Sequence, residues 1–177
     1  MSRAKRLPGC KGTMKSQVPN FKSPILLIGI GNKFRSDDGV GLEIAYRLKT
    51  LHLPGTTVVE ETGEGGALME AWKGADTVIL FDAVCSGAMP GTLHRFDAHE
   101  QSIPIKFFRC STHAFSIPEA IELARALHQL PARLIVYGIE GKNFAAGVGL
   151  SLEVEEAIQE VVERVLWEAQ FLSGHSS

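Results

Sequence analysis

The sequence has 177 residues and a mass of 19.2 kDa, which suits one domain with a single core. Hydrophobic residues make up 45% of it and charged residues 21%, a composition that excludes a disordered chain. Six of the 18 basic residues lie in the first 22 positions, where no acid occurs, so the rest of the chain holds 12 basic and 20 acidic residues, a net charge of −8. This acidic body argues against nucleic-acid binding, which needs a basic face.

The two ends of the chain are expected to lie outside the fold. We expect residues 1–22 to form a basic, disordered tail, residues 23–172 a single α/β domain, and residues 173–177 a flexible C-terminus. No apolar stretch approaches the roughly 18 to 20 residues of a membrane span, and no secretory signal pattern is present. We therefore expect a soluble cytoplasmic protein without a membrane partner. The three cysteines show no CxxC spacing, which favours reduced thiols over disulfides or a structural zinc site.

Strands and helices are predicted to alternate along the chain. Apolar or β-branched runs predict five strands, at Ile25–Ile30, Thr56–Glu61, Thr77–Val84, Gly91–Phe96 and Leu134–Ile139. Apolar residues at helical spacing predict helices from Gly39 onward and at Gly66–Trp72. Ser116 opens a further helix with capping-box spacing, and Ser151 is expected to cap the last one. Residues 98–112 show no period and predict a long loop.

This alternation predicts an α/β fold with three α/β/α layers around a central, mainly parallel, twisted sheet of about five strands. In such a fold the carboxyl ends of the strands share one edge, and ligands bind there. The loops that follow Ile30, Glu61, Val84 and Ile139 are therefore expected to meet at one edge.

The glycine-rich turn after the first strand does not favour a nucleotide. Phe34 stands where a dinucleotide fingerprint has its third glycine, and the carboxylates of Asp37 and Asp38 would repel a pyrophosphate. Acids in this position can cap the helix that follows, but capping needs only one side chain. The second carboxylate is then available to face the edge.

Three residues are placed where they can converge on one cleft: Asp38, Asp82 and His113. Asp82 interrupts an apolar strand, where a charge is costly unless it is paired, ligated or exposed in a cleft. A turn acid is the alternative for Asp82, and a hydrogen-bonded loop histidine is the alternative for His113. Two carboxylates and one imidazole with open positions suit a divalent transition metal.

Other polar residues near this edge allow further interpretations. Glu61 ends the second strand and can border the same edge, whereas Glu60 and Glu64 are interpreted as solvated or helix-starting acids. Cys85 raises the alternative of a thiol nucleophile with His113 as its base, although a lone cysteine is more often a small buried hydrophobe. The remaining histidines show no paired zinc-binding spacing and are assigned no role: His52, His94, His99, His128 and His175.

Three ordered motifs resemble those of the nickel-iron hydrogenase maturation proteases, which trim the C-terminus of the hydrogenase large subunit. They are Gly29-Ile30-Gly31-Asn32 followed by Ser36-Asp37-Asp38-Gly39-Val40-Gly41, then Phe81-Asp82-Ala83 followed by Pro90-Gly91-Thr92, and Ser111-Thr112-His113. The resemblance spans roughly residues 25 to 168. It implies that Asp38, Asp82 and His113 are the metal-contacting and catalytic residues, with Glu61 as a further acidic site residue.

The resemblance also implies a reaction. The protein would be an endopeptidase that removes the C-terminal extension of a nickel-loaded large-subunit precursor, with nickel carried by this partner and with no nucleotide cofactor. The trio would recognise the nickel and position or activate a water. Two other functions stay open: a non-enzymatic nickel-recognition or docking chaperone on the same fold, and a nucleotide-binding oxidoreductase, which Phe34 disfavours.

Overall fold

The computed structural model describes residues 24–110 and 115–172. One sheet runs in the order β2-β1-β3-β5-β4 and contains β1 (Ile25–Ile30), β2 (Thr56–Glu61), β3 (Thr77–Val84), β4 (Leu93–Asp97) and β5 (Arg133–Glu140). All pairings are parallel except that of β4 with β5. The predicted α/β fold with a mainly parallel sheet is thus confirmed. The predicted tail 1–22 and the segment 173–177 lie outside the described residues.

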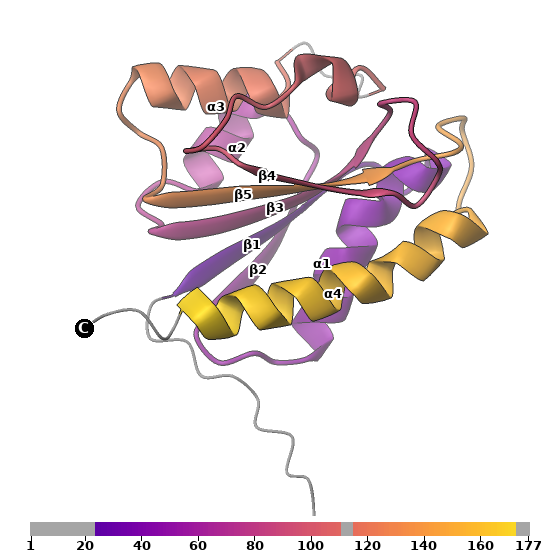
Figure 1. Cartoon of the computed structure of the whole chain (residues 1–177), viewed down its shortest axis with the longest axis horizontal. Coiled ribbons are helices and arrows are strands. Elements are labelled where there is room, and N and C mark those ends of the chain that lie inside the picture. Colours follow the sequence, from indigo (N-terminus) through magenta and orange to yellow (C-terminus); the bar gives the residue numbers. More distant parts are fainter. Residues whose placement is uncertain (1–23, 111–114, 173–177) are drawn as a thin grey trace, which may run out of the picture.

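Helices cover both faces of the sheet (Figure 1). Helices α1 (Val40–Thr50) and α4 (Leu152–Leu172) lie on one face, and α2 (Gly65–Ala71) and α3 (Ile117–Ala126) lie on the other. In the described part of the chain, no helix is both long enough and apolar enough to span a membrane. Two short 3-10 helices, η1 (Ser36–Gly39) and η2 (Ile105–Phe108), complete the elements.

Two hydrophobic cores, one on each face, hold these layers together. Phe81 and Tyr137 project from the central strands toward α1 and α4, where they meet Ile158. Their neighbours Leu80 and Val136 project the other way, toward α2 and α3. Because β3 and β5 are buried on both faces, they read in the sequence as continuous apolar runs rather than as alternating patterns.

Part of the predicted loop 98–112 is helical, which corrects that expectation. Helix η2 forms there because Phe108 is buried in the core and the ring of Phe107 packs edge-on against Phe96 of strand β4. These aromatic contacts are made with distant parts of the chain, so they leave no local period in the sequence.

The helix starts follow the sequence closely, with one difference. The capping box of Ser116 and Glu119 is present, and Glu64 caps α2 by accepting hydrogen bonds from its first N–H groups. Ser151 precedes α4 as expected, but its hydroxyl donates to Asp37 at 2.9 Å instead of accepting from the helix. The side chain of Ser151 therefore serves a contact between two loops.

Two glycines of the first motif are required because backbone packs against backbone. A Cβ at Gly41 would lie 2.2 Å from the carbonyl oxygens of both Ile30 and Phe81. Gly31 has a φ of +147°, and a Cβ there would lie 1.8 Å from the carbonyl oxygen of Asp38. The glycines thus bring the start of α1 onto the strand ends, a role that needs no bound dinucleotide.

The expectation of reduced thiols is wrong for two cysteines, because Cys85 and Cys110 form a disulfide. Cys85 follows β3 and Cys110 follows η2, and the backbone N–H of Cys85 donates to the carbonyl of Phe107 at 2.8 Å. Tertiary packing of η2 beside the end of β3 therefore pairs residues 25 positions apart. In this state Cys85 has no thiolate, so the alternative of a thiol nucleophile is not supported. Cys10 lies outside the described residues.

Replacing both bonded cysteines with serine should lower the free energy of unfolding by about 2–4 kcal/mol, because the cross-link restricts the unfolded chain. Urea unfolding without reductant measures this loss, and reduction of the wild type should reproduce it. Cys10→Ser serves as the control and should unfold like the wild type. Equal unfolding midpoints for the double variant and the control would contradict this prediction.

Candidate active site

The structure places three of the predicted site residues at the carboxyl edge of the sheet. Asp38 lies in η1, directly after β1, and is 8% exposed, while Asp82 lies near the end of β3 and is 4% exposed. Glu61 is the last residue of β2 and is partly exposed. His113 belongs to residues 111–114, outside the described residues, so its predicted place in the site stays a prediction.

The sheet register places Glu61 and Asp82 on the same face. Glu61 pairs with Ile30 across β1 and β2. Gly29 pairs with Phe81 on the other side of β1, so Asp82 comes level with Ile30. Side chains that are level in neighbouring strands project to the same face, and Ile30 packs toward α2 and α3. Glu60 projects the opposite way, toward α1.

The Asp82 carboxyl is buried beside a like charge. Burial raises its pKa, the negative charge of Asp38 raises it further, and the hydrogen bond from the Ala83 N–H opposes these effects only in part. The pKa of Asp82 therefore lies well above its usual range. In such a place either a proton or a cation stabilises the carboxyl.

Arg35 supplies a positive charge to this edge and was missed by the sequence analysis. Its Nη1 lies 3.6 Å from Oδ2 of Asp38 and donates to the carbonyl of Cys110 at 3.3 Å. Its Nη2 donates to the carbonyl of Phe144 at 3.3 Å. One guanidinium thus joins three loops. The only sequence signal is a basic residue beside the two aspartates, and nothing local identifies its partners.

Asp37 does not cap the helix that follows it, although the sequence predicted a cap from one of the two adjacent aspartates. Asp37 is fully buried and accepts hydrogen bonds from the N–H groups of Lys142, Asn143 and Ser151 and from the Ser151 hydroxyl. Burial alone would raise the pKa of Asp37, but these hydrogen bonds outweigh burial and lower it. Asp37 therefore fastens the segment before α4, and Asp38 faces the edge.

Glu140 fixes a second loop at the same edge. This buried carboxylate ends β5 and accepts from the N–H and hydroxyl of Ser86 and from the N–H of Gly87, while Nε2 of His94 lies 3.3 Å away. Burial raises its pKa, but the hydrogen bonds from Ser86 and Gly87 lower it below the usual value. Glu140 thus holds the loop that follows the Asp82 strand.

Two acids at this edge are donors of the kind that a divalent cation accepts. Among residues 24–110 and 115–172, no three histidine, cysteine or acidic side chains are grouped as ligands for one ion. Asp38 and Asp82 supply two carboxylates, which suit a divalent cation, and the predicted imidazole of His113 would be the third donor. The chemistry of the two acids is thus compatible with a cation that arrives from outside.

Asp82→Asn should stabilise the metal-free protein at neutral pH. A carboxyl whose pKa is raised by folding stabilises the native state below its ordinary pKa, and this contribution is lost as the pH rises through the raised native value. The amide removes the buried charge and keeps an oxygen for the Ala83 N–H. We expect the free energy of unfolding to rise by about 1–3 kcal/mol at pH 7 and to stay unchanged near pH 4. Urea unfolding at the two pH values measures this difference. The exposed Asp76→Asn is the control and should change little at either pH.

Asp37→Asn should have the opposite effect. A lowered native pKa gives stability that is present above the ordinary value and is lost as the pH falls through the native one. We expect the free energy of unfolding to fall by about 2–4 kcal/mol at pH 7, because an amide cannot accept all four hydrogen bonds. Below about pH 4 the fall should be smaller. Ser151→Ala removes only the hydroxyl donor and should cost less. Urea unfolding of these variants tests the ranking, and a loss for Asp37→Asn no larger than that for Asp76→Asn would refute it.

Comparisons with known proteins identify the family and the fold. Residues 42–168 match the hydrogenase maturation protease family. The chain is 31% identical over 153 residues to a Methanocaldococcus jannaschii protein assigned as a hydrogenase maturation protease, covering 83% of this chain and 97% of that protein. It is 26% identical over 146 residues to the hydrogenase 2 maturation protease of Escherichia coli, and this match covers 80% of this chain and 88% of that protein. The solution structure of an endopeptidase from Escherichia coli superposes with a TM-score of 0.74 at 25% identity, covering 85% and 94%. The chain belongs to the hydrogenase maturation protease family and is an endopeptidase.

Proposed function

We propose that this protease removes the C-terminal extension of a nickel-loaded hydrogenase large-subunit precursor, and that Asp38, Asp82 and His113 recognise the nickel. The observation that supports this most is the buried carboxyl of Asp82, whose pKa is raised by burial and by the charge of Asp38. A cation at this edge would relieve the repulsion between the two acids, so the site favours a substrate that brings positive charge.

Nickel in this proposal is part of the substrate. Two carboxylates and an imidazole are ligands that divalent transition metals accept. Because the ion arrives with the precursor, cleavage would report that nickel insertion is complete. We place this reaction in the cytoplasm. Disulfides are rare in that compartment because cellular thiols reduce them, so the Cys85–Cys110 bond would have to resist this reduction.

The chemistry at this edge is hydrolysis of one peptide bond. A water attacks the scissile carbonyl carbon, the carbon–nitrogen bond breaks, and the departing amine takes up a proton. Asp38 and Asp82 would position the nickel and the water, and His113 would complete the contact with the metal. A carboxylate that is released from the metal would take the proton from the water and pass it to the amine. Glu61, on the same face as Asp82, would be a further acidic residue of the site.

A processing assay tests this proposal. Wild-type enzyme incubated with a nickel-loaded precursor should release the C-terminal extension, seen as a mass loss, and should leave the nickel-free precursor intact. Asp82→Asn and His113→Ala should lower the rate by at least about 100-fold, because each removes a group that contacts the reacting centre. Asp76→Asn is the matched control and should process normally. A normal rate for either site variant would show that the site is wrongly assigned.

A further inference from the structure

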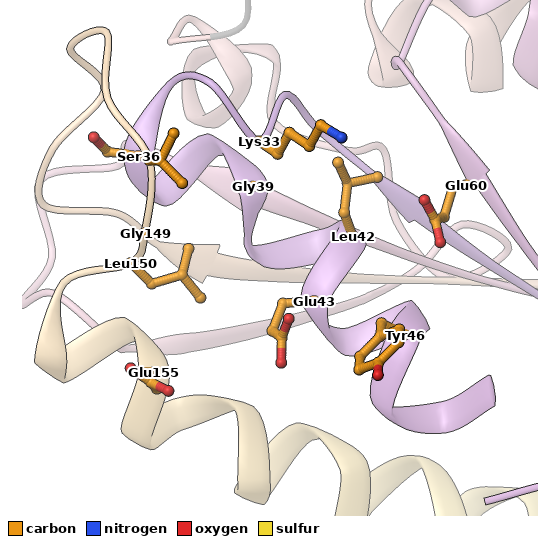
Figure 2. Close-up of a pocket in the computed structure, with 11 residues that line it drawn as sticks. Lys33, Ser36, Gly39, Leu42, Glu43, Tyr46, Glu60, Gly149, Leu150 and Glu155 are labelled. Carbon is orange, nitrogen blue, oxygen red and sulfur yellow. The ribbon is translucent and has the colours of Figure 1, made fainter. Parts of the chain in front are cut away.

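Two adjoining cavities lead away from Asp38 along helix α1. The first has a volume of about 370 Å³ and is lined by Asp38 together with Phe34. The second has a volume of about 460 Å³ and is lined by Tyr46 and Val148. Both are lined by the same three side chains: Lys33, Leu42 and Glu60. We call the two cavities together the α1 groove. Figure 2 shows Leu42, Glu43 and Tyr46 on α1, with Glu60 on one side and Leu150 and Glu155 on the other.

The groove exposes large apolar side chains. Phe34 is 61% exposed, Tyr46 58% and Val148 83%. They come from three separate segments: the loop after β1, helix α1 and the segment before α4. Exposed apolar side chains gathered in a hollow are typical of binding sites and leave a protein with a surface that a partner can cover.

The groove is also acidic. Three carboxylates line its second cavity, those of Glu43, Glu60 and Glu155, against the single ammonium group of Lys33. Arg47 pairs with Glu43 at 2.9 Å and with Glu155 at 3.6 Å. Glu60 is exposed, and its carboxylate makes no hydrogen bond or ion pair with a residue in the described ranges. Glu60 is therefore the carboxylate that remains for a positively charged ligand.

Building on the proposed function, we infer that the α1 groove binds the part of the precursor that follows the scissile bond. An extended chain advances about 3.3 Å per residue, so a chain cut beside Asp38 reaches the groove within a few residues. Cavities of this size accept a short peptide and not a folded domain. The folded body of the precursor, which carries the nickel, therefore stays at the open sheet edge, and the extension enters the groove.

The lining defines the chemistry of this segment. It is an extended peptide with an apolar side chain that packs against Tyr46 and Val148 and with a basic side chain that pairs with Glu60. Tyr46, Val148 and Glu60 thus give affinity for the extension without contacting the reacting atoms. These three residues are specificity determinants, and their loss should weaken substrate binding without slowing the chemical step.

Steady-state kinetics on two substrates tests the inference. One is the nickel-loaded precursor with its whole extension, and the other is the same precursor shortened to one residue beyond the bond that the wild-type enzyme cuts. For the whole extension, Tyr46→Ala and Glu60→Lys should each raise KM by about tenfold with kcat unchanged, because they remove ground-state binding. For the shortened precursor, both variants should match the wild type.

Matched controls separate the groove from general effects of substitution. Trp167→Ala removes an aromatic side chain of similar exposure, 60%, from α4. Glu156→Lys reverses an exposed charge next to Glu155 but outside the groove. Both should keep wild-type KM values on both substrates.

Each result decides between the two proposals. Suppose that the wild type cuts the precursor but the groove variants have the wild-type KM, or have a KM raised by the same factor on both substrates. The groove assignment is then wrong, while the protease site stands. If the wild type cuts neither precursor, the proposed function itself fails. Replacing a basic residue of the extension with glutamate should restore binding to Glu60→Lys, and absence of this rescue would overturn the pairing with Glu60.

Discussion

The repulsion between two buried carboxylates is the constraint on which this site depends. Asp38 follows β1 and Asp82 lies near the end of β3. Burial raises the pKa of Asp82, and the charge of Asp38 raises it further. Arg35 lies 3.6 Å from Asp38, but the described structure shows no ion pair for Asp82. Arg35 therefore balances the charge of Asp38, and Asp82 can be neutralised by a proton or by a cation from outside the described chain.

The surrounding acids show how the same chemical group serves opposite purposes. Asp37 and Glu140 are buried as well, but each accepts several hydrogen bonds from backbone N–H groups, which lower its pKa. They stay ionised, and their hydrogen bonds hold two loops in place at the sheet edge. Within the described residues, Asp82 accepts one hydrogen bond, from Ala83, and burial together with the charge of Asp38 raises its pKa. The number of donors around each carboxylate separates the two acids whose pKa is lowered from the one whose pKa is raised.

The sequence was sufficient for features that have a local cause. Three predicted strands, at 25–30, 56–61 and 77–84, have the observed bounds because apolar or β-branched runs end there at turns. Asp82 was identifiable because a charge interrupts one of these runs. Strand β4 begins two residues later than predicted, because an edge strand that is only half buried has a weaker hydrophobic pattern.

The features that the sequence analysis missed have distant partners. The disulfide joins residues 25 positions apart, and an odd number of cysteines without a motif gives no sign of it. The side chain of Arg35 reaches carbonyls 75 and 109 positions away. One of Asp37 and Asp38 was expected to cap the adjacent helix, but the donors to Asp37 are more than 100 positions along the chain. In each case the tertiary fold, and not the local pattern, selects the partner.

The contacts of Arg35 have a consequence for how the site responds to acid. A guanidinium keeps its charge at every pH that a folded protein tolerates. The junction that it makes between Asp38, Cys110 and Phe144 therefore holds while the proton on Asp82 comes and goes. Proton uptake by Asp82 therefore leaves the contacts of Arg35 in place, so the charge of the site can change while the loops around it keep their positions.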